Sequence, residues 1–302
     1  MNGHNRKLTI WITGSAGFLG TRLARYLTSK GHQVTGLSRR ETQLVNKSVI
    51  IDLAADDACE RLRDLIENAG PPDVLIHAAS KQPGSGTLPD FIRSNVKTSR
   101  NMVETFRAQP PHHVIYTSTL SVYNNPATLP VKETEPAGGV LPYSATKRWS
   151  EQLWEGFTHL APVIVLRLPS LYGAGHTESF IDGLAKQALV GQPIELFSRG
   201  EVIRDALHVS DAVKGIATCA ENRLEGSFSL FNLGCGRRIT TAEYARALVD
   251  ALKSKSSLIP VDKPAPQPDL YADIAEARRA FGFEPMSLEE SMRTYANELS
   301  TR

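Results

Sequence analysis

Glycines at every third position follow the first apolar run of the chain. The run, Leu8 to Thr13, has the length and composition of a buried strand, and the glycines are Gly14, Gly17 and Gly20. A segment with helical apolar spacing begins at about Phe18 and extends to about Ser29. This order of strand, glycine turn and helix is the feature that most restricts the possible folds.

The glycine spacing predicts a site for the phosphates of a nucleotide. Gly14 permits a tight turn, Gly17 lets a pyrophosphate approach the backbone, and Gly20 lets the helix pack on the strand. The first helical residues, Phe18 and Leu19, then present backbone N–H groups to the phosphates. An ordinary glycine-rich turn has the same composition, but the position between a strand and a helix favours a nucleotide site.

Apolar runs of strand length alternate with helix-period segments over about the first 170 residues. This alternation predicts an α/β fold with a doubly wound parallel sheet, and we expect a dinucleotide-binding Rossmann domain over residues 1–170. Beyond it, helices predominate and four prolines lie between Pro260 and Pro268, which indicates a smaller, mostly helical substrate-binding region over residues 171–302. We expect the chain to return to the sheet at about 205–233. The expected strands are Leu8–Thr13, Gln33–Ser38, Ser48–Asp52, Asp73–Ala78, His113–Ser118 and Pro162–Leu168, and the expected helices are Phe18–Ser29, Asp57–Ala69, Asp90–Ala108 and Tyr143–His159.

Charge and cysteine content exclude several classes of protein. The 302 residues include 34 Lys and Arg against 32 Asp and Glu, so no excess of charge points to nucleic acid or to an anionic membrane. The 3 cysteines are far apart, which indicates neither a disulfide framework nor a zinc site. No apolar run reaches about 18 residues, and the polar segment Met1–Lys7 leads directly into a strand without a signal peptide's apolar segment. We therefore expect a cytoplasmic enzyme without a metal.

The end of the second strand bears on the choice of cofactor. It carries Ser38, Arg39 and Arg40, where a fold that prefers NAD usually places an acidic residue for the ribose 2′-hydroxyl. Guanidinium groups bind phosphate bidentately and stack on adenine, so the pair favours NADP over NAD, although a solvated basic turn has the same composition. Position at the ends of the third and fourth strands adds further expected cofactor contacts, which are Asp52, Leu53, Ala78, Ala79 and Ser80.

A tyrosine and a lysine open the helix that begins at about residue 143. Tyr143 and Lys147 are four residues apart and lie on one helix face, where an ammonium favours the phenolate and lowers the pKa of the tyrosine. A hydroxyl from the segment Thr117–Thr119 would polarise a carbonyl beside that phenol. Such a trio suits proton transfer coupled to hydride transfer.

Several motifs together resemble the extended short-chain dehydrogenase/reductase family, also called the NAD-dependent epimerase/dehydratase family. They are TGSAGFLG at Thr13–Gly20, STLSVY at Ser118–Tyr123, YSATK at Tyr143–Lys147, RLPSLYGAG at Arg167–Gly175, RDALHVSDA at Arg204–Ala212 and FNLGCG at Phe231–Gly236.

The resemblance assigns roles to individual residues. It implies Tyr143 as the acid/base, Lys147 as the modulator of its pKa and a ribose ligand, and Thr119 as the hydrogen-bond partner of the substrate. It also implies that Asn95 supports the backbone and water of the active site. His208 and Asp211 match motif positions that are more structural than chemical, and a carboxylate near a helix N-terminus is the favoured interpretation of Asp211.

The same resemblance narrows the reaction. The family's 4,6-dehydratases carry acidic residues directly after the catalytic Thr or Ser, whereas this chain has Leu120 and Ser121. The apparent preference for NADP fits net reduction, so the leading prediction is reduction of the 4-keto group of a nucleotide-linked sugar, with Tyr143 as proton donor. The alternatives are a nucleotide-sugar 4-epimerase that recycles a tightly bound NAD(P), and a non-catalytic NADP-binding regulator.

Candidate substrate contacts lie in the second half of the chain. Ser170 replaces the asparagine that many relatives use to contact the diphosphate, and Arg204 is a candidate ligand for that group, or the partner of an acid such as Asp205. Lys263 is a weaker candidate, and a carbonyl substrate without a nucleotide is a further alternative. The resemblance also implies a homodimer through the helices near 90–108 and 143–159.

Overall fold

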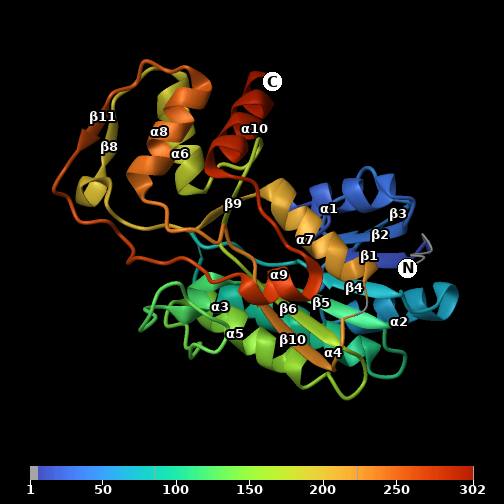
Figure 1. Ribbon diagram of the computed structural model, residues 1–302. Helices are drawn as coiled ribbons and strands as arrows, with labels where there is room; N and C mark the ends of the chain where they lie inside the picture. Colours follow the sequence, from blue (N-terminus) through green and yellow to red (C-terminus); the bar gives the residue numbers. More distant parts are fainter. Residues whose placement is uncertain (1–5, 85, 223, 302) are drawn as a thin grey trace. The chain divides into compact units, whose positions relative to one another are not determined.

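The computed structural model describes residues 6–84, 86–222 and 224–301, and the chain divides into two compact units (Figure 1). Unit 1 consists of the chain up to Asn124 together with Ala137–Arg167 and Val213–Phe231, and unit 2 consists of Asn125–Pro136, Leu168–Ala212 and the chain from Asn232 onward. The sequence places one division at about residue 170 and a return at about 205–233. The structure divides the chain after Arg167, and it assigns to unit 2 a short early segment that the alternation of elements does not mark.

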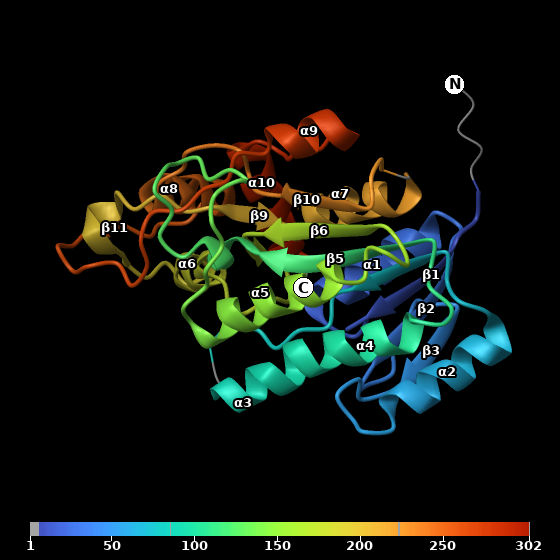
Figure 2. The ribbon, with the colours of Figure 1, turned by 90° about the horizontal axis from the view of Figure 1, so that it is seen from below.

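Within the described residues, unit 1 is built around a seven-stranded sheet with the order β10-β6-β5-β4-β1-β2-β3. Strand β1 pairs in parallel with β2 and β4, β2 with β3, and β4 with β5. Helices α1 and α7 cover one face, and α2, α4 and α5 cover the other (Figure 1, Figure 2). This arrangement confirms the predicted doubly wound α/β fold. The elements are β1 Thr9–Thr13, α1 Phe18–Ser29, β2 Gln33–Ser38, β3 Lys47–Ile50, α2 Ala58–Ala69, β4 Val74–His77, α3 Leu88–Phe91, a π-helical turn Ile92–Lys97, α4 Thr98–Phe106, β5 His113–Thr119, a 3-10 turn Leu120–Tyr123, α5 Pro142–Glu155, β6 Val163–Leu168, α7 Val209–Glu221 and β10 Phe228–Asn232.

One core layer of unit 1 lies between the sheet and helices α2, α4 and α5. Trp11, Leu75 and Tyr116 of the sheet pack with Phe106 of α4 and Trp154 of α5, and all five side chains are buried. Burial of apolar surface stabilises such a layer by roughly 25 cal/mol per Å². The packing fixes α5 against β5, and these two elements carry the predicted catalytic residues.

Two of the predicted helices differ from the observed elements. The helix expected over Asp90–Ala108 is divided into α3, the π-helical turn and α4. The π-helical turn surrounds Asn95, whose carbonyl oxygen accepts a hydrogen bond from the Ser99 hydroxyl. A π-helical turn inserts one extra residue into a helix, and this moves the apolar positions by only one place. The spacing of apolar residues in the sequence therefore does not reveal the turn. The helix expected to reach His159 ends at Glu155, where a glycine follows.

Unit 2 contains two small sheets and four helices in the described part of the chain. Strand β7 pairs in parallel with β9, and β8 pairs in parallel with β11. Its core includes Tyr172, Ile181, Tyr244 and Tyr295, and the Tyr295 hydroxyl donates to an Asp182 carboxylate oxygen at 2.8 Å. The elements are β7 Ser170–Tyr172, α6 Phe180–Leu189, β8 Ile194–Leu196, a 3-10 turn Phe197–Gly200, β9 Ala206–His208, α8 Thr241–Leu252, β11 Leu258–Pro260, α9 Ala275–Phe281 and α10 Leu288–Ser300.

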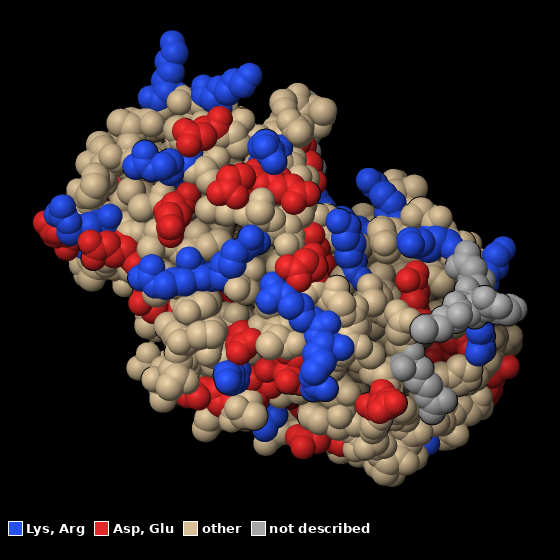
Figure 3. Space-filling model, viewed as in Figure 1, with Lys and Arg blue, Asp and Glu red and all other residues tan. Residues whose placement is uncertain are grey.

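Three further features bear on the kind of partner. Among the helices that the structure describes, none has the length and apolar character needed to span a bilayer. The described histidines, cysteines and acidic residues form no group of three that would hold a metal ion. Basic and acidic side chains are mixed over the face of the molecule drawn in Figure 3.

Candidate active site

The glycine turn is held tightly against the end of β4. Gly14 adopts a φ of 70°, and its N–H donates to the Leu37 carbonyl oxygen at 2.8 Å. A Cβ atom at Gly14 would lie 2.8 Å from the Ala79 Cα atom, and one at Gly20 would lie 2.2 Å from the Gly14 carbonyl oxygen. Both contacts are too short for any side chain, so the close approach of the backbones requires glycine at these positions.

The start of α1 is suited to bind an anion. Its N-cap residue Gly17 makes no side-chain capping bond, and the first turn, which contains Phe18 and Leu19, carries no acidic residue. The positive end of the helix dipole is therefore not balanced by a carboxylate of its own first turn. This is the arrangement that binds phosphate groups in dinucleotide folds, so the residues present fit a dinucleotide.

Thr13 connects the glycine turn to β4 through its hydroxyl group. Its Oγ1 atom accepts hydrogen bonds from the N–H groups of Ala78 at 3.1 Å and Ala79 at 3.0 Å, and it lies 2.8 Å from His77 Nδ1. Because both lone pairs are used, the hydroxyl proton is donated to His77 Nδ1, and His77 Nε2 then donates to the Ser99 hydroxyl at 3.1 Å. Burial lowers the pKa of His77 to about 3, so the ring is neutral.

The basic end of β2 lies beside the glycine turn. Arg39 and Arg40 are exposed, and the Arg40 guanidinium donates to the Ala16 carbonyl oxygen at 3.5 Å. The Ser38 hydroxyl donates to the Arg40 carbonyl oxygen, which bends the chain as it leaves the strand. The two guanidiniums are thus available to a group bound next to the turn.

The expected cofactor contacts after β3 and β4 differ in whether their side chains are free to reach a bound cofactor. Although burial raises the pKa of Asp52, hydrogen bonds from Arg93 at 2.7 Å and from the Ala54 N–H hold it below its ordinary value. Leu53 is buried in the core, which leaves mainly its backbone near the edge of the sheet. Ser80 donates to the Asn95 side-chain oxygen at 3.2 Å.

Asn95 links the end of β4 to the helix that carries the tyrosine. Its buried side-chain oxygen accepts from the Ser80 hydroxyl and from the Lys81 N–H at 2.8 Å, and its amide donates to Thr146 Oγ1 at 3.0 Å. The π-helical turn places this side chain between α5 and the loop after β4. Lys81, which no motif of the sequence marks, directly follows the predicted contacts Ala78, Ala79 and Ser80 in that loop.

Tyr143 is half-buried in the first turn of α5, directly after a proline that favours this start of the helix. Its ring contacts Phe91 edge to face with centres 6.2 Å apart. Burial raises the pKa of Tyr143 to about 12, and hydrogen bonds with the Thr119 and Ser80 hydroxyls act in the opposite direction. The pKa of Tyr143 is thus raised, not lowered as its spacing to Lys147 predicts, because burial outweighs the hydrogen bonds, and the phenol is protonated at neutral pH.

Lys147 lies one turn later on α5 and is 2 % exposed. Its Nζ atom donates to the Thr117 carbonyl oxygen at 2.5 Å and lies 4.3 Å from the centre of the Tyr116 ring. Burial lowers the pKa of Lys147 to about 7, whereas the charge of Glu151 raises it. The ammonium can thus gain or lose its proton close to neutral pH.

The three hydroxyls at the end of β5 face different partners. The Thr117 hydroxyl donates to the His77 carbonyl oxygen, and the Ser118 hydroxyl donates to the buried Glu151 carboxylate. The Thr119 hydroxyl reaches Tyr143 and also accepts from the Ser121 N–H at 3.2 Å. Of these three residues, Thr119 is the one that the structure brings to the tyrosine.

The predicted substrate contacts belong to unit 2. Ser170 is exposed at the start of β7, opposite Ala206 of β9. The Arg204 guanidinium donates to the carbonyl oxygens of Pro268 at 2.6 Å and Gln267 at 2.8 Å, whereas Asp205 accepts from two backbone N–H groups. Lys263 pairs with Glu195 at 2.7 Å.

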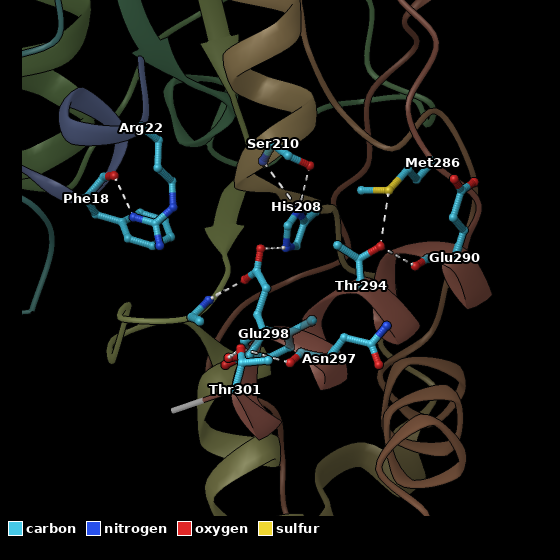
Figure 4. Close-up of polar contacts among 12 residues, drawn as sticks. Phe18, Arg22, His208, Ser210, Met286, Glu290, Thr294, Asn297, Glu298 and Thr301 are labelled. Atoms are coloured by element: carbon cyan, nitrogen blue, oxygen red, sulfur yellow. Dashed lines mark hydrogen bonds and ion pairs between the residues drawn. The ribbon is translucent and has the colours of Figure 1, made fainter. Parts of the chain in front are cut away.

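His208 and Asp211 make contacts within unit 2 that fix the backbone. His208 Nδ1 lies 2.8 Å from the Ser210 hydroxyl, and its Nε2 lies 3.5 Å from a Glu298 oxygen (Figure 4). Asp211 lies in the first turn of α7 and accepts from the Met286 N–H at 3.0 Å. These contacts agree with a structural role for both side chains.

Comparison with known proteins identifies the family. The model of the NAD dependent epimerase/dehydratase family matches residues 10–234. The chain belongs to this family. The match confirms the resemblance to the extended short-chain dehydrogenases/reductases.

Relatives within the epimerase/dehydratase family align over nearly the whole chain. A probable UDP-glucuronate 4-epimerase of Rhizobium meliloti (strain 1021) is 26% identical over 332 residues, which cover 94% of each chain. A UDP-glucose 4-epimerase of Azospirillum brasilense is 26% identical over 91% of this chain and 87% of that protein. The structure of MoeE5 in complex with UDP-glucose and NAD is 25% identical, with a TM-score of 0.82 and coverage of 97% and 99% of the two chains.

Proposed function

We propose that this protein is a nucleotide-sugar 4-epimerase that uses a bound nicotinamide dinucleotide. The observation that carries the proposal is the group formed by Thr119, Tyr143 and Lys147 at the carboxyl end of β5, within the same unit as the glycine turn. Two relatives that align over more than nine-tenths of this chain are named as 4-epimerases. Their names favour epimerisation over the reduction of a 4-keto sugar.

Each residue of the site would have a different role in the proton transfer. A bound nicotinamide dinucleotide, with its phosphates held by the glycine turn and the start of α1, would supply reversible hydride transfer at the sugar C4 atom. Tyr143 takes the proton of the 4-hydroxyl group and later returns it, while Thr119 holds the oxygen atom. The Lys147 ammonium, next to Tyr143 on the helix, favours the phenolate during this transfer.

We propose NAD as the cofactor of the cycle, with NADP also accepted. Epimerisation returns its hydride, so it does not need the reducing power of NADPH, and MoeE5 was solved with NAD. The preference for NADP that Arg39 and Arg40 predict has no specific support from the relatives. Their exposed guanidiniums beside the glycine turn nevertheless offer partners to a 2′-phosphate.

Unit 2 would select the substrate in this proposal. Arg204 and Ser170 are its candidate contacts for the diphosphate, with UDP as the nucleotide that the relatives' names suggest. We also propose a homodimer, because Leu88, Ile92 and Trp149 expose apolar side chains on the helices expected to form the interface.

A stoichiometry assay tests the proposed reaction. The purified protein is incubated with NAD and, in turn, UDP-glucose, UDP-glucuronate and UDP-N-acetylglucosamine, and the products are analysed by NMR with absorbance followed at 340 nm. We expect the 4-epimer of one sugar to form without net change in reduced cofactor, and the matched variant Tyr143→Phe to bind NAD but form none.

Two outcomes would contradict this function. Stoichiometric consumption of NADPH with a 4-keto nucleotide sugar, without epimer formation, would favour the reductase. Binding of NADP without turnover of any substrate in wild type and Tyr143→Phe alike would favour the non-catalytic regulator.

A further inference from the structure

A buried carboxylate that the proposed reaction does not use lies one turn beyond Lys147. Glu151 is 1 % exposed, and it accepts hydrogen bonds from three other residues. Arg167 of β6 donates to both of its oxygens, at 3.0 Å from Nε and 2.7 Å from Nη2, and the Ser118 hydroxyl of β5 donates to one. Arg148 donates to the second oxygen at 3.2 Å. Glu151 therefore joins α5 to the two neighbouring strands.

Fold stability alone gives a weak reason for this ion pair. Arg167 is also buried, and its guanidinium lies 4.7 Å from the centre of the Tyr123 ring. Replacing a buried ion pair with apolar residues of similar volume is often neutral or stabilising, because desolvation of both charges offsets their attraction. Its position beside the catalytic group points to a second purpose.

The Glu151 carboxylate acts on two elements of the site, the helix α5 and the end of strand β5. On its own helix, Glu151 follows Lys147 by four residues, so the two lie on the same face, and its charge opposes the loss of the Lys147 proton. On the strand, it holds the hydroxyl of Ser118, the residue directly before Thr119.

The other groups that face Lys147 cannot replace this charge. His77 of β4 is neutral, and the Tyr116 ring of β5 contributes its face while burial raises the pKa of its hydroxyl. Tyr143, on the same helix, is protonated at neutral pH because burial raises its pKa to about 12. Arg167 of β6 and Arg148 of α5 are both engaged with Glu151 itself.

We propose that Glu151 is a positioning residue of the proton-transfer step, whose negative charge balances the Lys147 ammonium while its bond from Ser118 fixes the strand end that carries Thr119. The inference rests on the proposed function for its kinetic consequence. Its structural part, the coupling between Glu151 and Lys147, is independent of the substrate.

Two substitutions separate the charge of Glu151 from its packing. Glu151→Gln keeps the shape and removes the charge, so the alkaline limb of the kcat–pH profile should move down by about one pH unit, with KM and the Kd for NAD changed less than about twofold. Glu151→Asp keeps the charge, so its alkaline limb should stay in place even if the protein is less stable. Arg148→Gln is the matched control at the same carboxylate, and its limb should not move down.

A double variant tests the inference if Glu151→Gln does not fold. If Glu151→Gln leaves the buried Arg167 guanidinium unbalanced and the protein insoluble, the double variant Glu151→Gln/Arg167→Met removes both charges, and its alkaline limb should still lie below that of wild type. A uniform loss of kcat at every pH in both Glu151 variants, without a shift of the limb, would overturn the inference.

A readout without substrate separates this inference from the proposed function. The NMR titration of the Lys147 side chain, assigned with Lys147→Arg, should move to lower pH in Glu151→Gln and not in Glu151→Asp. An unchanged titration overturns the role of Glu151. Absence of epimerase activity in wild type, with the titration shifted as expected, would overturn the proposed reaction alone.

Discussion

Lys147 carries an ammonium in surroundings that disfavour it. Burial lowers its pKa to about 7 from 10.5, so between these values the unfolded chain binds more protons than the folded one. The free energy of unfolding contributed by this group therefore increases as the pH rises from 7 toward 10.5. The ammonium that we propose for the proton transfer thus costs stability at neutral pH.

A lysine-to-methionine exchange measures this cost. Lys147→Met should abolish the proposed epimerisation, because the phenolate of Tyr143 loses its neighbouring charge. Its free energy of unfolding in urea should be compared with that of wild type at several pH values. We expect wild type to gain stability relative to the variant as the pH rises from 7 to 10, and a constant difference would contradict the lowered pKa.

Arg39 and Arg40 are the proposed partners of a 2′-phosphate, the group that distinguishes NADP from NAD. Replacement of both Arg39 and Arg40 by alanine should weaken NADP binding about tenfold or more, because each lost charge-assisted hydrogen bond costs roughly 1.5–3 kcal/mol. NAD, which lacks the 2′-phosphate, should change less than about twofold. Calorimetric titration of both cofactors checks this, and equal losses would refute the assignment.

At the scale of elements, the glycine turn and α1 depend on a contact between backbones. Gly20→Ala would bring a Cβ within 2.2 Å of the Gly14 carbonyl oxygen, which the turn cannot accommodate. We expect a loss of about 3 kcal/mol or more in unfolding free energy, at the upper end for overpacking, together with weaker cofactor binding.

The matched control for this glycine lies in another helix. Gly183 of α6 is exposed, and a Cβ there would meet nothing within 4 Å. Gly183→Ala should stabilise the protein by about 0.5–1 kcal/mol, because alanine loses less backbone entropy in a helix. Urea unfolding of both variants checks the pair, and similar effects would contradict the contact at Gly20.

Helices and strands whose ends are set by neighbouring residues in the sequence could be predicted. Features that depend on contacts between different elements could not. The helix Phe18–Ser29 and the strand Gln33–Ser38 have the predicted bounds, because Gly17 precedes the helix and Gly31 separates it from the strand. The π-helical turn at Asn95 and the pair of Glu151 with Arg167 depend on contacts between different elements of the folded structure. Apolar periodicity contains no signal for such contacts. The sequence does show that Glu151 follows Lys147 by four residues, which places both on one face of the helix, and the structure buries both.

At the scale of the whole molecule, exposed apolar side chains bear on assembly. Trp149 on α5 is 45% exposed, and Leu88 and Ile92 are exposed near the start of the neighbouring helical segment. Single exposed apolar residues are ordinary, whereas a group on adjacent elements indicates a contact surface.

A charge introduced at this surface tests the homodimer. Trp149→Glu should convert a dimer into a monomer in sedimentation velocity, because a carboxylate would be buried unpaired in the interface. Leu189→Glu, at an apolar residue that is 55% exposed in unit 2, is the control and should leave the mass unchanged. A monomeric wild-type protein would contradict the dimer.

The Thr13 hydroxyl starts a chain of buried hydrogen bonds in unit 1, and each bond in this chain has a fixed donor and acceptor. Its proton is committed to His77, the ring proton of His77 to Ser99, and the Ser99 proton to the Asn95 carbonyl oxygen. A relay of protons requires that each member can reverse its orientation, and Thr13 cannot, because two backbone amides already occupy its lone pairs. The hydrogen bonds of this row therefore all run in one direction, and a proton cannot be passed back along it from Ser99 to Thr13.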